Sequence, residues 1–124
     1  MSEQLIKNIE HSAVHNLESL IDYKPGKVAS LTLSQKKSVG MTLFAIDKGE
    51  GLNTHSAPGD AFAQILEGTV EITIADEKYT LTGGQSVVMP ANIPHALKAV
   101  EPFKFLLVLI KPEPKPKPQA QSSK

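Results

Sequence analysis

This 124-residue sequence contains neither cysteine nor arginine. Without cysteine the chain can form no disulfide, thiolate nucleophile, iron–sulfur cluster or thiolate zinc site. Without arginine it lacks the planar, bidentate donor that proteins use for phosphate, carboxylate and guanine. Lysine is then the main source of positive charge, and recognition of nucleic acid is disfavoured.

Charge and hydropathy give no sign of a polyanion or membrane partner either. Acidic and basic residues balance at 13 each, so the chain has no net field to attract nucleic acid or an anionic bilayer. Residues 1–12 carry scattered charges and no apolar core of signal-peptide length. The longest apolar run, residues 105–110, is far shorter than a membrane span. We expect a cytoplasmic protein with neither a nucleic-acid nor a membrane partner.

Composition and pattern divide the chain into three parts. The first, residues 1–26, contains one predicted short helix at 16–26, which Asn16 would cap and a Pro-Gly pair would end. The second, residues 27–110, is the expected folded domain. The third, residues 111–124, alternates proline with lysine or glutamate before it becomes polar. It predicts a disordered tail, with a proline-rich ligand for a partner domain as the alternative.

The folded domain consists of short strand-like segments separated by turns. No helical pattern interrupts them, which indicates an all-β barrel or double-sheet sandwich. The expected strands are 27–34, 39–47, 61–68, 70–76, 78–84, 86–90, 95–100 and 103–110. The last strand is apolar on both faces, as in a strand that a second sheet or a partner subunit covers. We therefore predict a homodimer.

Two motifs in this domain resemble those of the cupin superfamily of small, conserved β-barrels. The first cupin motif carries a glycine, two histidines, a glutamate and a glycine, and the matching positions here are Gly49, His55, Ala57, Ala61 and Gly68. The second carries a glycine, a proline, a glycine, a histidine and an asparagine, and the matching positions are Gly84, Pro90, Asn92, His95 and Ala99. The resemblance covers about residues 27–110. It implies a double-stranded β-helix, or jelly-roll, barrel.

The resemblance also implies a metal site, of which this sequence keeps only part. Cupin metal sites typically use three histidines and one glutamate, or glutamine or histidine in its place. Here His55 and His95 remain, whereas Ala57 and Ala61 cannot act as ligands. Two imidazoles alone rarely hold a divalent ion firmly. We therefore expect little or no tightly bound metal.

Asp60, one residue before the missing glutamate, has two interpretations. As a third ligand beside His55 and His95 it would complete a site for Zn, Ni, Fe, Mn or Cu. Strand alternation, however, points its side chain away from the face that Ala61 occupies. The preceding Pro-Gly pair instead favours a turn residue whose carboxylate accepts hydrogen bonds from backbone N–H groups.

The two alanines leave room for a ligand inside the barrel. The face of the strand that carries Ala61 and Ala63 lines the barrel by the motif match, and methionine or leucine side chains would supply soft apolar walls. The residues of the expected pocket are His55, Ala57, Ala61, Ala63, Met41, Leu43, Met89 and His95. Such a cavity is mostly apolar and has two histidines as its polar groups. The alternative is that all of these residues simply pack the core.

Three functions are compatible with the sequence, and none identifies a catalytic residue. The preferred hypothesis is a protein that binds a small, partly apolar molecule in the barrel, with little or no tightly bound metal. The second is a metal-dependent enzyme of the isomerase or dioxygenase type that uses His55, His95 and an unconventional third ligand. The third is a structural or regulatory module whose barrel is filled. The fold alone does not select among them.

Overall fold

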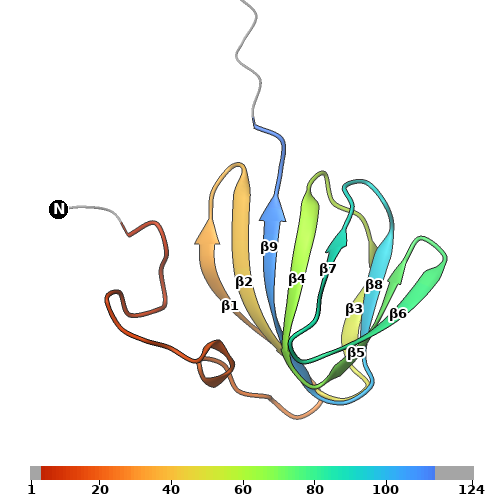
Figure 1. Ribbon diagram of the computed structural model, residues 1–124, viewed down its shortest axis with the longest axis horizontal. Helices are drawn as coiled ribbons and strands as arrows, with labels where there is room; N and C mark the ends of the chain where they lie inside the picture. Colours follow the sequence, from red (N-terminus) through yellow and green to blue (C-terminus); the bar gives the residue numbers. More distant parts are fainter. Residues whose placement is uncertain (1–3, 114–124) are drawn as a thin grey trace, which may run out of the picture.

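The computed structural model describes residues 4–113, and its regular structure is almost entirely antiparallel β (Figure 1). The strands are β1 Val28–Gln35, β2 Val39–Ile46, β3 Gly51–His55, β4 Asp60–Glu67, β5 Thr69–Ile74, β6 Glu77–Thr82, β7 Ser86–Met89, β8 His95–Ala99 and β9 Phe103–Ile110. They form a large sheet in the order β1-β2-β9-β4-β7 and a small sheet in the order β3-β8-β5-β6. Two facing sheets of this kind are a jelly roll, as the sequence predicts.

The main core lies between the two sheets. Ala61, Ala63 and Ile65 alternate along β4 with residues of the opposite face, and all three are buried in this core. On β9 the ring of Phe105 stacks on that of Phe103, with centroids 5.3 Å apart. Full burial of one such apolar side chain contributes about 2 kcal/mol. The core therefore holds the sheets together and fixes the direction in which each strand presents its side chains.

A second core lies on the outer face of the large sheet, under the N-terminal extension. Leu43 of β2 and Leu33 of β1 are fully covered there by Ile21 and its neighbours in the extension. Leu106 of β9 packs against the same cluster. Part of the second apolar face of β9 is thus covered by this chain itself. The two apolar faces of β9 therefore do not require a partner subunit, and the homodimer stays a prediction.

The predicted helix at 16–26 is not an α-helix. The structure has one short turn of 3₁₀-helix there, η1 Leu17–Ser19, and the Asn16 side chain makes no capping hydrogen bond. Leu17 and Leu20 instead pack on the second core as parts of an irregular segment. The apolar spacing in this segment therefore reflects packing against the large sheet, and no α-helix forms.

A buried lysine fastens the extension to the large sheet. Lys104 on β9 is 8% exposed, and its Nζ donates a 2.6 Å hydrogen bond to the carbonyl oxygen of Glu18. The same ammonium lies 4.8 Å from the centre of the Tyr23 ring and 4.0 Å from a Glu67 carboxylate oxygen. The Tyr23 hydroxyl donates to that carboxylate at 2.7 Å. Burial, and then this contact with Glu67, raise the pKa of Tyr23.

Two further points concern membrane-spanning helices and the predicted C-terminal tail. No helix among residues 4–113 is long and apolar enough to cross a bilayer. Most of the predicted tail, residues 114–124, lies outside the described part of the chain. Residues 111–113, which begin that tail, belong to no strand.

Candidate functional site

His55 and His95 meet at one end of the barrel. His55 ends β3 and His95 begins β8, and the antiparallel register makes them direct partners. Their ring centroids are 4.5 Å apart, with the planes at 68°, so one ring presents its edge to the other. His95 is only 4% exposed, whereas His55 is exposed at the mouth. The sequence therefore correctly predicts that these two distant histidines come together.

Backbone carbonyls orient both rings. The Nδ1–H of His55 donates to the carbonyl oxygen of Asn53 at 2.7 Å, and that of His95 donates to Ile93 at 3.1 Å. Because a carbonyl can only accept, each Nδ1 carries the proton, and the neutral ring keeps its lone pair on Nε2. Burial lowers the pKa of His95, the nearby His55 lowers it further, and the Ile93 carbonyl partly opposes them. At neutral pH His95 is thus a neutral acceptor.

A small cavity of about 70 Å³ lies against the histidine pair. We call it the histidine pocket. Its walls are apolar apart from the two imidazoles. The lining residues are Leu52, His55, Ala57, Ala61, Met89, His95, Leu97, Phe105, Leu107 and Leu109. Five of the residues expected from the sequence, His55, Ala57, Ala61, Met89 and His95, are among them.

Three expected residues do not line this pocket. Met41 and Leu43 point to the outer face of β2, into or against the second core. Ala63 faces the barrel but lies deeper, fully buried in the main core. The wall that was expected from β2 is supplied by β9, through Leu107 and Leu109. The alternation of Leu107 and Leu109 along β9 is the sequence signal that could have indicated this wall. It was not decisive, because both faces of that strand are apolar.

Asp60 does not join the histidines. Its carboxylate accepts a 2.8 Å hydrogen bond from the backbone N–H of Ala91, outside the wall of the histidine pocket. This is the turn role that the Pro-Gly pair predicted. Among residues 4–113 no group of three or more His, Cys, Asp or Glu side chains is placed to hold a metal ion. The donor set around His55 and His95 therefore does not fit a tight metal site.

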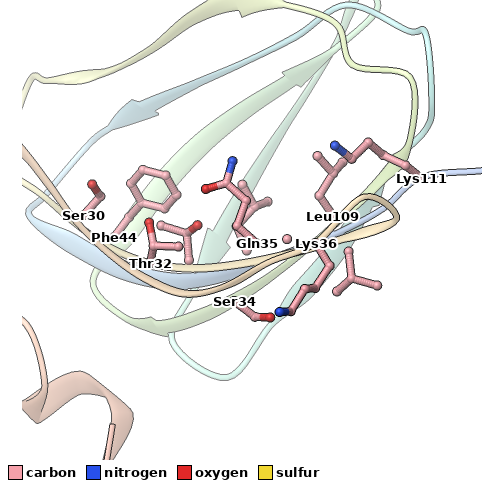
Figure 2. Close-up of a pocket in the computed structure, with 12 residues that line it drawn as sticks. Ser30, Thr32, Ser34, Gln35, Lys36, Phe44, Leu109 and Lys111 are labelled. Carbon is pink, nitrogen blue, oxygen red and sulfur yellow. The ribbon is translucent and has the colours of Figure 1, made fainter. Parts of the chain in front are cut away.

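A larger groove of about 350 Å³ opens beside the pocket (Figure 2). It lies over the inner face of β1 and β2, which the small sheet leaves uncovered, and we call it the β1–β2 groove. The lining residues are Ser30, Thr32, Ser34, Gln35, Lys36, Val39, Gly40, Thr42, Phe44, Leu107, Leu109 and Lys111. Leu107 and Leu109 belong to both cavities. Sequence reasoning missed this groove, because which residues of β2 face inward is not apparent from its pattern.

Comparison with known proteins places this geometry in a family. The family model for the cupin domain matches residues 42–109. A conserved protein of unknown function from Streptococcus pyogenes is 46% identical to this chain. The match covers 92% of this chain and 100% of that protein, with a TM-score of 0.89. This chain belongs to the cupin family. A cupin superfamily protein from Desulfitobacterium hafniense is 30% identical over 86% of this chain and 98% of its own, with a TM-score of 0.83. No curated protein matches this cupin.

The cupin motifs keep their turns even where residues depart from the pattern. Asn92 stands where the second motif has glycine, and its φ of 63° lies in the left-handed region that asparagine tolerates better than most residues. Gly68 ends the first motif with a φ of 86°, and a Cβ there would overlap the carbonyl oxygen of Pro102. The turns of the scaffold are thus retained, and Ala57 and Ala61 change the wall of the histidine pocket.

Proposed function

We propose that this cupin binds a small, partly apolar molecule in the histidine pocket and does so without a tightly bound metal. The observation that carries the proposal is that two small side chains stand where the family pattern has metal ligands, which leaves space in the cavity. Ala57 and Ala61 put methyl groups into the wall at two positions where the family pattern has metal ligands. An apolar cavity with a few convergent polar groups is the usual form of a small-molecule site.

The histidine pair supplies the polar side of this binding. Because each Nδ1–H is held by a carbonyl, each neutral ring offers its Nε2 as a hydrogen-bond acceptor. His95 is the more buried of the two, and its lowered pKa favours the neutral form. We expect it to accept a hydrogen bond from a hydroxyl or amide of the ligand, while His55 lies nearer to solvent.

A titration with hexan-1-ol tests the proposal directly. At 13.4 kDa the protein is well suited to amide-resolved NMR, and the alcohol should shift the resonances of Ala61, Leu97 and Leu109. Ala57→Leu fills the mouth of the pocket and should weaken this binding at least tenfold, about 1.4 kcal/mol. The matched control is Ala96→Leu, which adds the same side chain next to His95 but on the outer face of β8.

The other outcomes of this titration are equally informative. If hexan-1-ol shifts no resonance of the pocket and does not raise the melting temperature, the barrel is filled and this cupin is a structural module. Equal binding by the wild type and Ala57→Leu would place the alcohol elsewhere and contradict the proposal. Ala61→Leu is a second, deeper substitution that closes the same cavity from β4.

The metal-dependent enzyme remains a second candidate because of one observation. Both Nε2 atoms are free of the carbonyl contacts that hold the Nδ1 atoms, and the rings are 4.5 Å apart. A ligand that itself carries donor atoms could complete a coordination shell that the protein leaves short. Such a site would need the ligand for tight metal binding, which separates it from an ordinary cupin metal centre.

A further inference from the structure

The histidine pocket is too small to hold a whole metabolite. Its volume of about 70 Å³ is roughly half that of an engineered cavity that binds benzene. A molecule whose apolar end enters this pocket must continue outside it. The adjoining β1–β2 groove, of about 350 Å³, lies in the range of small-molecule sites. Leu107 and Leu109 form a common apolar floor that leads from one cavity to the other.

The groove differs from the pocket in its hydroxyl groups. Thr32 of β1 and Thr42 of β2 are direct cross-strand partners, and Ser30 lies opposite Phe44 in the same register. Residues two apart on a strand share a face, so the three hydroxyls line the inner face together. Each hydroxyl can donate one hydrogen bond and accept others. One side of the groove is therefore polar while its floor is apolar.

The charged side chains that line the groove are both lysines. Within residues 4–113, Lys36 and Lys111 line the groove, the histidines line the pocket, and no Asp or Glu side chain lines either cavity. Lys111 follows β9, and its backbone N–H donates a 2.8 Å hydrogen bond to Ser38. Figure 2 shows its side chain extending from this fixed point across the groove above Leu109. The local charge therefore favours an anion over a cation.

We propose that the ligand of this cupin is a small amphipathic carboxylate that spans both cavities. Its partly apolar end fills the histidine pocket, where a hydroxyl or amide donates to Nε2 of His95, and its carboxylate lies in the β1–β2 groove. There it accepts hydrogen bonds from Lys111 and from the hydroxyls of Thr32 and Thr42. The assignment rests on the proposed function, because it is this end of the ligand that the histidine pocket would bind. It adds the charge of the ligand and the place of its head group.

Three probes of equal chain length test this assignment: hexanoate, hexan-1-ol and hexylammonium. Calorimetric titration at low salt near neutral pH should give the tightest binding for hexanoate and the weakest for hexylammonium. Lys111→Ala should weaken hexanoate about fivefold, the effect of one part-exposed, charge-assisted hydrogen bond, and leave hexan-1-ol unchanged. The matched control is Lys78→Ala, which removes an exposed lysine on β6 of the small sheet.

Two further measurements locate the head group. Thr42→Val removes a hydroxyl at nearly constant shape and should also weaken hexanoate without affecting hexan-1-ol. Raising the salt concentration should weaken hexanoate alone, because a part-exposed charge contact is screened. Amide shifts from hexanoate should be large at Thr42 and Ser30, where its carboxylate lies, whereas hexan-1-ol should shift these two amides less than those of the pocket.

The proposal and the function beneath it fail in different ways. If hexanoate and hexan-1-ol bind equally and Lys111→Ala affects neither, the carboxylate assignment is overturned and the apolar pocket stands. If neither probe binds, or Ala57→Leu leaves both unchanged, the proposed function itself is overturned. Tighter binding of hexylammonium than of hexanoate would contradict the charge argument outright.

Discussion

The two faces of β2 differ in how they are covered, one being sealed within the chain and the other open to a groove. Leu43 points outward, is fully buried, and is covered by the N-terminal extension. Thr42, the preceding residue, points inward and lines an open groove. The outer face is sealed by apolar contacts and by the Lys104 network, whereas the inner face keeps hydroxyl groups and space. Where the chain covers its own sheet the residues are structural. Where it leaves the sheet open they are available to a ligand.

The largest effect should come from breaking the sealed face. Leu43→Ala should lower the free energy of unfolding by about 3 kcal/mol, because it opens a cavity in the second core. Thr42→Val, one residue away, should change it by less than about 0.5 kcal/mol, as is usual for a part-exposed site. Urea denaturation of the two variants measures both values. Similar losses would show that the groove face is as structural as the core.

The contacts of Lys104 with the extension should contribute less to the free energy of unfolding than the apolar second core does. Lys104→Ala removes the donor to Glu18 and the contact with Tyr23, and should destabilise the protein by about 2 kcal/mol. Tyr23→Phe should cost about 1 kcal/mol, the usual net value of one hydrogen bond. The double variant should cost less than the sum, because both act through Glu67. Strict additivity in a denaturation cycle would show that the contacts are independent.

The smallest expected effect is the pH dependence that His95 contributes. Its pKa is lowered from 6.5 in the native state, so the unfolded chain binds its proton more readily. The stability that this provides is fully present above about pH 6.5. It is lost as the pH falls through that value toward the native pKa. His55 is the titratable group that contacts His95.

Denaturation of the wild type and His95→Gln on both sides of this range measures the contribution. The wild type should lose more stability than the variant when the pH falls from the neutral to the mildly acidic side. Parallel pH profiles for the wild type and His95→Gln would contradict the linkage.

The sequence predicts the strands of this cupin well where only one face is apolar, and less well elsewhere. Along β4 the alternation around Ala61 assigns its barrel face correctly. Along β2 both faces carry apolar residues that contribute to a core, so Met41 and Leu43 were assigned to the wrong side. The strand β3, with polar residues at a sheet edge, has no apolar pattern and was missed.

The candidate site was predictable to the extent that motif positions fix it. His55, Ala57, Ala61 and His95 follow from the spacing of two motifs, and the fold brings them together. The groove residues Ser30, Thr32 and Thr42 belong to no motif, and only the arrangement of the sheets exposes them. Small hydroxyl residues on a strand are compatible with either face. Their proposed function in binding could not be predicted without knowing which part of the sheet is left uncovered.

Native mass spectrometry of the protein purified without a histidine tag tests the central claim most directly. The account predicts the mass of the chain, alone or with a small organic molecule that Ala57→Leu excludes, and less than about a tenth of an equivalent of transition metal. One equivalent of Zn, Ni, Fe, Mn or Cu per chain would contradict it, provided that His55→Ala/His95→Ala removes the metal. That result would make this cupin a metal-binding protein in spite of Ala57 and Ala61.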